Sequence, residues 1–196
     1  MTKVIDDIDA GASRRVVVIG TLAAAAGLAA MVGDAQAATA AELDASASAA
    51  LRKLYASSSR ARELSRRARA VLIFPRITKA GFVVGGQGGD GVLRVGGKTT
   101  GYYRIAAASF GFQAGAQTFG YALFLVTRSA LDYLRSSKGW AIGTGPSVVI
   151  IDQGAAKQAD TTTLSQDVYA MPFNQKGLMA GISLEGSKIS QIHPDR

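Results

Sequence analysis

The stretch that decides the fold is Phe74-Pro75-Arg76-Ile77-Thr78-Lys79-Ala80-Gly81-Phe82-Val83-Val84-Gly85-Gly86-Gln87-Gly88-Gly89-Asp90-Gly91-Val92-Leu93. The helical pattern before it stops at Pro75, because proline lacks the N–H that a helix interior needs. From Gly81 onward the chain changes to a glycine-rich pattern that is typical of strands and turns. The dipeptide Asp90-Gly91 is a strong hairpin signal, so the pattern predicts a strand near 80–87, a turn at 88–91 and a strand near 92–95.

One five-residue pattern occurs four times, first within this stretch and then in the chain after it: Gly, a large apolar residue, two further residues, then Gly. It occupies residues 81–85, 111–115, 139–143 and 177–181. Residues i and i+4 share one face of a strand, so each pair of glycines leaves a shallow track that permits strong curvature. We therefore expect a strongly curved or barrel-like antiparallel sheet. Its further strands are predicted near 100–105, 109–117, 120–127, 139–151, 167–172 and 177–187.

The chain before Pro75 has the pattern of an amphipathic helix. Small and apolar residues recur at spacings of three and four and form one helical stripe: Ala47, Leu51, Leu54, Ser58, Ala61, Leu64, Ala68 and Val71. Ser57-Ser58-Ser59 indicates a break in it, and Thr127 is placed to cap a short helix over 129–136. The sequence thus predicts an α+β fold: a basic helical segment at about 40–74, the curved sheet at about 80–187, and a short additional helix.

The first 37 residues have the features of an export signal. Arg14-Arg15 precedes an apolar run over 16–32, and Ala35-Gln36-Ala37 resembles a small-x-small cleavage site. The paired arginines favour the twin-arginine route, although Val17 stands where that motif favours Phe, so a Sec signal stays an alternative. An uncleaved anchor is the other alternative, since 17 residues is the short limit for a spanning helix. In each case we expect one domain, residues 38–196, outside the cytoplasm.

The residue types present exclude several classes of chemistry. There is no Cys, which excludes disulfides, thiolate metal sites and Cys nucleophiles, and His193 is the one His, which argues against a His-centred triad or a multi-His metal site. The segment 86–91 satisfies GxGxxG but is followed by a strand pattern, so it does not predict a dinucleotide site. Asp90 and Glu185 are a weak candidate pair for acid–base catalysis. We expect no cofactor, no small-molecule substrate and no enzymatic activity.

Positive charge is concentrated in one segment. The chain carries a net charge of +8, and residues 51–80 hold nine Lys or Arg against Glu63 alone. Such an imbalance is too one-sided for a salt-bridged helix face and favours a surface that meets a polyanion. Nucleic acid is one possible polyanion, but the export signal separates the domain from it. An anionic membrane surface agrees better with the leader.

The chain resembles the SYLF domain family in an ordered series of blocks over about residues 45–187. These are the quoted stretch with Ala68-Arg69 before it, then Gly101-Tyr102-Tyr103, the block 111–117, and the block 177–186. The resemblance implies a domain that binds acidic phospholipids, including phosphoinositides in eukaryotic relatives, with no catalytic step. It also implies membrane contact through the basic N-terminal region, which corresponds here to Arg60, Arg62, Arg66, Arg67, Arg69 and Lys79.

Two features depart from the bacterial relatives: there is no Cys to acylate, and residues 188–196 contain no Tyr. The resulting prediction is a non-enzymatic protein of the bacterial envelope that binds anionic phospholipid membranes through a basic helical surface. It would be exported and associate peripherally with the membrane. The alternative is an envelope structural or adaptor protein whose partner is a protein or an acidic glycan.

Overall fold

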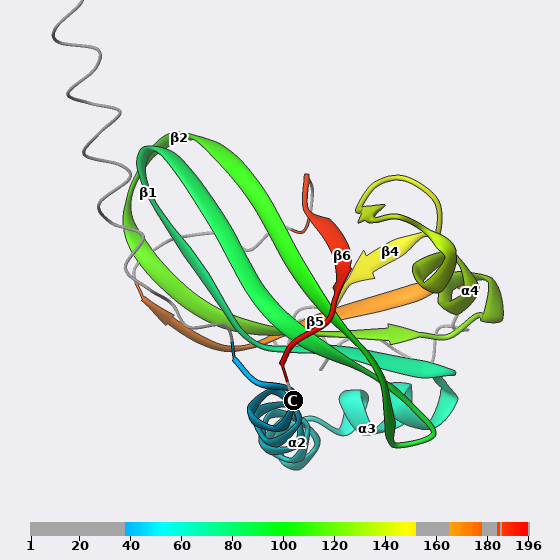
Figure 1. Ribbon diagram of the computed structural model, residues 1–196. Coiled ribbons are helices and arrows are strands. Elements are labelled where there is room, and N and C mark those ends of the chain that lie inside the picture. The colour runs from blue at the N-terminus through cyan, green and yellow to red at the C-terminus, as the bar shows by residue number, and fades with distance from the viewer. Residues whose placement is uncertain (1–37, 152–164, 178–183, 185, 196) are drawn as a thin grey trace, which may run out of the picture. The chain divides into compact units, whose positions relative to one another are not determined.

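Two helices and a long β-hairpin form the first half of the folded chain (Figure 1). The computed structural model describes residues 38–151, 165–177, 184 and 186–195, so the predicted export signal at 1–37 lies outside the described residues. The elements in chain order are α2 (Ala40–Ser57), α3 (Ser59–Arg67), β1 (Ala70–Val95), β2 (Lys98–Leu125), α4 (Arg128–Ser136), β3 (Trp140–Ala141), β4 (Val148–Ile150), β5 (Val168–Gly177) and β6 (Lys188–Ile192).

Local capping determines where α2 and α3 begin and end. Thr39 and Glu42 form a capping box at the start of α2, in which the Glu42 carboxylate accepts from the Thr39 N–H at 2.8 Å. Ser58 ends α2 and caps α3, because its hydroxyl accepts from the Ala61 N–H at 3.1 Å. The predicted break in the helix at the serine run is therefore confirmed.

The hairpin of β1 and β2 differs from the prediction. Residues 88–91 do not turn; they pair with 103–106 in the middle of a continuous ladder. The reversal comes at Gly96 and Gly97, whose φ angles of 57° and 80° suit glycine and the tight turn between long strands. A local turn dipeptide was thus overridden by pairing along the whole strand. The predicted strands at 109–117 and 120–127 are likewise one strand, β2.

Within the described ranges the sheet has six strands, and β2 is its central member. One edge of β2 pairs with β1, while the other edge pairs with β6 at 102–106 and with β5 at 117–125. The strand β3 pairs with β6, and β4 pairs with β5 in the parallel direction. The curved sheet of the predicted α+β fold is confirmed, but it is mixed rather than purely antiparallel.

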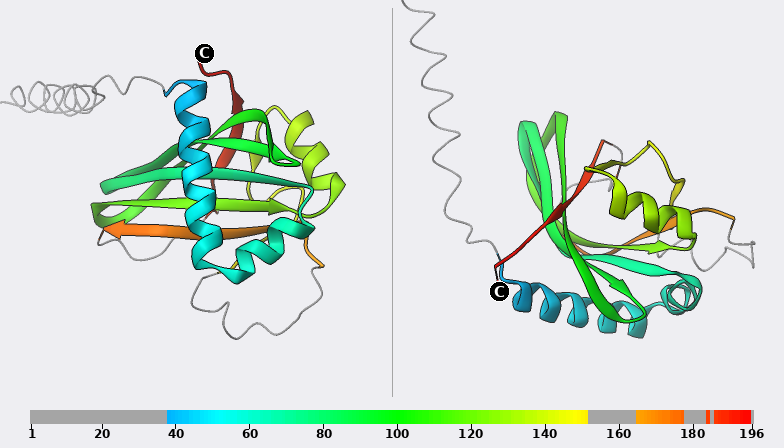
Figure 2. Two further views of the ribbon diagram at one scale, coloured as in Figure 1. Left: turned by 90° about the horizontal axis from the view of Figure 1, so that it is seen from below. Right: turned by 45° about the vertical axis from the view of Figure 1, so that its right-hand side comes forward.

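Each face of the sheet buries its own core. The face under α2 and α3 packs Leu51, Leu54 and Leu64 against alternate residues of β1, β2 and β5. The opposite face packs the other alternate residues, together with Trp140, against α4. Figure 2 shows α2 and α3 on one side of the curled strands and α4 on the other. The predicted helical stripe is confirmed as far as Leu64, since five of its members are buried on α2 and α3: Ala47, Leu51, Leu54, Ala61 and Leu64. The helical segment was predicted to continue to about residue 74 and to stop at Pro75, and this part is wrong: α3 ends at Arg67, and Val71 and Pro75 lie within β1, because residues 70–74 pair with 121–125 of β2.

The curl brings the two halves of β1 against each other. A Cβ added to Gly91 would lie 2.6 Å from the carbonyl oxygen of Ile73 and would overlap the Phe74 ring. A Cβ on Gly89 would meet the Arg76 carbonyl oxygen and Ile77. Only a residue without a side chain permits this approach, so these two glycines allow the strand to cross its own beginning.

The second half of the chain agrees with the prediction in part. Thr127 caps α4, accepting from the Ala130 N–H at 3.2 Å, so the short additional helix is confirmed. Residues 139–151 are not one strand, because Gly143 takes a φ of 102° in a turn between β3 and β4. The strand predicted near 177–187 falls mostly on residues outside the described part of the chain.

We predict that Gly91→Ala lowers the free energy of unfolding by about 1–3 kcal/mol, because the new methyl group must push apart two segments of β1. Chemical denaturation of both proteins measures the difference. Gly86→Ala is the matched control: its Cβ would lie 3.6 Å from the nearest atom, which is ordinary contact. Equal stability of the Gly91 variant and the wild type would contradict the close approach.

Candidate functional site

An open groove of about 550 Å³ lies where the end of α2, the end of α3 and the β1–β2 turn meet. Its floor is apolar and includes Leu51 and Val71, both nearly buried. Three arginines line it: Arg52 from α2, Arg69 from the link between α3 and β1, and Arg94 from the end of β1. The combination of an apolar floor and a cationic rim suits an anionic amphiphile.

The backbone fixes the position of Arg69. Helix α3 ends at Arg67 with Ala68 as its C-cap, and the Arg69 N–H donates to the Leu125 carbonyl at 2.7 Å, which joins the link to the sheet. The Arg69 side chain is exposed at the groove and has no ion pair or hydrogen bond within the described residues, and the same is true of Arg52. Both cations are therefore available to a ligand.

Arg94 is held more firmly. Its side chain is 19% exposed, and one terminal nitrogen donates to the Ser48 hydroxyl at 2.7 Å and to the Asp44 carbonyl at 3.2 Å. Its Nε is buried and has no hydrogen-bond partner in the described part of the chain. A terminal nitrogen of Arg94 also lies 4.0 Å from a carboxylate oxygen of Asp44, so the charge of Arg94 is already paired within the described part of the protein. Arg52 and Arg69 are the groove arginines that lack a carboxylate partner among the described residues.

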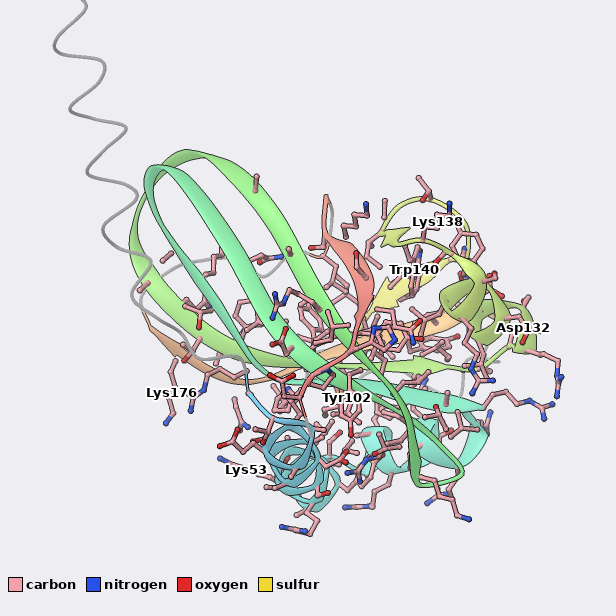
Figure 3. The ribbon with its side chains drawn as sticks, in the orientation of Figure 1. Lys53, Tyr102, Asp132, Lys138, Trp140 and Lys176 are labelled. Atoms are coloured by element: carbon pink, nitrogen blue, oxygen red, sulfur yellow. The ribbon has the colours of Figure 1, made fainter. Side chains whose placement is uncertain are left out.

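Asp44 ties α2 to the hairpin beside the groove. Its carboxylate accepts from the Thr99 hydroxyl at 2.7 Å and from the Tyr102 hydroxyl at 3.0 Å, and Tyr102 points from β2 toward α2 in Figure 3. Burial, and then the hydrogen bond to Asp44, raise the pKa of Tyr102 above its ordinary value. Burial likewise raises the pKa of Tyr55 in the groove wall. Both phenols are neutral at physiological pH, so the charge at the groove comes from the arginines.

The structure separates the six predicted site residues. Arg60 and Arg67 both pair with Glu63, at 2.9 and 3.3 Å, and Arg62 donates to the carbonyl oxygen of Tyr55. These three side chains stabilise α3 and its junction with α2. The remaining three are Arg66, Arg69 and Lys79.

Of these three, Arg66 and Arg69 are exposed without a partner in the described residues. Lys79 is separate from them. It pairs in register with Gln117 and, by strand alternation from buried Ile77, points to the face of the sheet away from α2 and α3. The structure therefore does not gather all six on one helical surface.

Charge on the helices is also less uniform than predicted. Helix α2 carries two acidic and two basic residues, and one acidic residue of α3 binds two of its four arginines. A single basic helical face is not confirmed. Sequence reasoning missed Arg52 and Arg94 as site residues. Arg52 belongs to the recognised basic run, but Arg94 reaches the groove only through the hairpin register, for which the sequence carries no local signal.

The weak catalytic candidates are not supported as a pair. Asp90 forms a two-bond ion pair with Arg104, at 2.6 and 2.9 Å, which occupies its carboxylate, and Glu185 lies outside the described residues. Within the described ranges, no cluster of three or more His, Cys, Asp and Glu could hold a metal ion. No helix in that same part of the chain has the length and apolarity needed to cross a membrane.

We predict that Asp44→Ala lowers the free energy of unfolding by about 1–2 kcal/mol, because it removes the acceptor for two hydroxyl groups that join α2 to β2. Thermal unfolding measures the change. Asp132 is exposed on α4, so Asp132→Ala removes the same charge without a partner in the described residues and should be nearly neutral (Figure 3). Similar losses in both variants would mean that Asp44 does not tie the helix to the hairpin.

Comparison with known proteins gives one family match. Residues 106–194 match a family model described as Ysc84, Las17-binding protein actin regulator. None of the curated proteins matches the chain. The matched segment begins within β2 and extends beyond β6, so α2, α3 and β1, which supply the groove arginines, precede it.

Proposed function

We propose that this chain is a binding protein of the SYLF (Ysc84) family, whose model matches residues 106–194, and that it docks on anionic phospholipid membranes through the face that bears α2 and α3. The proposal includes no catalytic step. It places the domain in the bacterial envelope, exported by its N-terminal segment and peripherally associated with the membrane. The support for these parts comes from the sequence of the leader and from the residues of the groove.

The observation that carries the proposal is the groove with its unpaired cations. Arg52 and Arg69 line it without a carboxylate partner in the described residues, and Arg66, which is exposed on α3, follows the lining residue Ser65 in the chain. A charged helix surface that is merely solvated usually intersperses both signs of charge. Here the carboxylate of Glu63 is already shared by Arg60 and Arg67, which leaves the groove side positive.

The apolar floor favours a lipid over a purely polar polyanion. A lipid headgroup presents a phosphate to the arginine rim while its glycerol and first methylene groups contact Leu51 and Val71. A polyanionic glycan would leave those apolar side chains without a matching surface. Arginine suits the phosphate because its planar guanidinium can donate two parallel hydrogen bonds.

The binding should be moderate and dominated by charge. Each Lys or Arg near an anionic surface contributes about 1 kcal/mol, so Arg52, Arg66 and Arg69 together contribute about 3 kcal/mol, or roughly a hundredfold in affinity. This attraction is screened by salt. The inserted apolar area is small, since the exposed side of α3 is polar, so insertion adds little.

We predict that residues 38–196 sediment with vesicles of phosphatidylcholine and phosphatidylglycerol at low salt and are released by high salt. Arg52→Glu, Arg66→Glu and Arg69→Glu together should lower the affinity at least a hundredfold, because three attractions become repulsions. Co-sedimentation across a range of vesicle concentrations measures the effect, with vesicles of phosphatidylcholine alone as the neutral reference.

The matched control reverses three exposed cations near α4, on the opposite side of the sheet: Arg128→Glu, Arg135→Glu and Lys138→Glu. The net charge changes equally, so an effect of total charge would appear in both variants. Equal loss in both would refute a defined docking face. Undiminished binding by the groove variant would refute the groove itself.

A protein partner is the second candidate, because the family description names binding to the protein Las17. That description concerns the family, and its counterpart here would be an envelope protein or an acidic glycan held by the same cationic face. This second candidate requires that substitution of the groove arginines weakens binding to a non-lipid partner. It also requires that the protein does not sediment with vesicles of either composition. The sedimentation experiment therefore separates the two candidates.

A further inference from the structure

A second, smaller pocket lies on the other flank of α2. Its volume is about 170 Å³, and it is formed by side chains of α2, β1, β2 and β5. Three of its lining residues are cations: Lys53 from α2, Arg76 from β1 and Lys176 from β5. Thr118 and Asn174 add a hydroxyl and an amide. Polar donors from four separate elements thus converge on one small space.

Two β-bulges flank this pocket, one on each neighbour of β2. On β1 the pairing runs from Phe74↔Tyr121 to Ile77↔Phe119, so β1 has one extra residue there. On β5 the pairing runs from Phe173↔Gly120 to Lys176↔Thr118, again with one extra residue. Both irregularities therefore lie opposite the same short piece of β2, residues 118–121. Bulges reorient side chains and are frequent beside functional sites.

The bulges decide which way two of the cations point. With regular pairing Arg76 would stand opposite Phe119, and Lys176 would stand opposite Gln117, both of which are buried on the face away from α2. A register shift of one residue moves a side chain to the other face of the sheet. Each bulge therefore transfers one cation from the core side to the side of the pocket.

The β5 bulge also holds an unusual backbone conformation. Asn174 has a φ of 52° and is the one residue other than glycine with a positive φ in the described part of the chain. Asparagine tolerates this left-handed conformation better than most residues, but it still costs free energy. Such a conformation persists where the surrounding structure imposes it, and here it belongs to a residue that lines the pocket.

The three cations lack compensation. Lys53, Arg76 and Lys176 have no ion pair or hydrogen bond among the described residues. A purely structural explanation of the bulges is that each one keeps the cation of its strand out of the core. That explanation does not account for the position of Arg76 and Lys176 around the same pocket as Lys53 from α2. Figure 3 shows Lys53 and Lys176 on the same side of the molecule. Like charges gathered around one cavity favour the binding of an anion.

We propose that this pocket binds a compact phosphate-type oxyanion through Lys53, Arg76 and Lys176, with Thr118 and Asn174 as neutral donors. The volume suits a tetrahedral oxyanion and is too small for a sugar chain or an acyl tail. Consecutive residues on a helix point about 100° apart, so Arg52 and Lys53 direct one cation to each flank of α2. The site does not depend on the groove, and it would exist whether or not the groove binds lipid.

The test is a titration of the full-length protein with inorganic phosphate, followed by NMR of the backbone amides. We expect saturable shifts at Arg76, Thr118 and Lys176. Sodium chloride at matched ionic strength should not reproduce them. Arg76→Gln and Lys176→Gln should each weaken the affinity about tenfold, because each removes a charged hydrogen-bond donor.

Two controls keep the result interpretable. Lys138→Gln removes an equal charge from an exposed position near α4 and should leave the affinity for phosphate unchanged. Lys176→Arg keeps the charge and should retain most of the affinity, which a purely structural role of Lys176 would not predict. Shifts that follow ionic strength alone, or that survive both glutamine substitutions, would overturn the proposal.

A second arm identifies the source of the phosphate. Vesicles with phosphatidic acid present a phosphomonoester, whereas vesicles with an equal fraction of phosphatidylglycerol present a phosphodiester. A loss of binding by Lys176→Gln confined to the phosphatidic acid vesicles assigns the site to a lipid headgroup. A loss seen only with inorganic phosphate assigns it to a soluble phosphate. The phosphate titration uses no vesicles, so its result does not depend on whether the groove binds membranes. The phosphate site and the membrane-binding groove are therefore tested independently.

Discussion

The close approach of β1 to itself is the constraint on which the rest of the structure depends. Gly89 and Gly91 have no side chain where the strand passes over residues 73–77, so the hairpin can curl tightly while β1 stays paired with β2 on both sides of its register shifts. The curl gives the sheet two different faces, each with its own core. Helices α2 and α3 cover one face, and α4 with Trp140 covers the other. A flat hairpin would offer neither helix layer a matching surface.

The cationic sites follow from the same geometry. The hairpin turn brings Arg94 beside the first half of α2, where Asp44 and Ser48 hold it, and this arrangement makes one wall of the groove. At the other flank of α2, two register shifts against β2 bring Arg76 and Lys176 toward Lys53. Helix α2 is nearly neutral itself, yet it separates two positive sites. Their charge comes mainly from sheet register and from the links between elements.

Local signals in the sequence predicted local structure. The helical stripe up to Leu64, the serine break and the Thr127 cap depend on residues a few positions apart, and all three are confirmed. The predicted continuation of the helix to Pro75 failed, because residues 70–74 pair with β2 as a strand. Asp90-Gly91 failed as a turn signal because pairing along the whole of β1 outweighs the preference of two residues. Asp90 instead pairs with Arg104 across the ladder. The parallel pairing of β4 with β5 could not be predicted from local signals either, since it joins segments separated by a long connection.

The cationic groove was predicted only in part, because the sequence shows which residues are basic but not which of them are paired in the folded chain. The basic run led to Arg66 and Arg69, which are exposed and unpaired in the described residues. It also included Arg60 and Arg67, whose charge Glu63 offsets on successive turns of α3. Residue spacing alone does not distinguish a cation held by a carboxylate from one that is free. Arg94 and Lys176 required the strand register, which only the folded chain provides.

Hydrogen–deuterium exchange of the protein with and without anionic vesicles tests the central claim most directly. That claim is that the face with α2 and α3 meets the membrane surface. We expect slower exchange over residues 59–70 and over the hairpin turn at 94–98 when vesicles are bound, with exchange in α4 unchanged. Protection of α4 in place of these segments, in a sample shown to be bound, would contradict it.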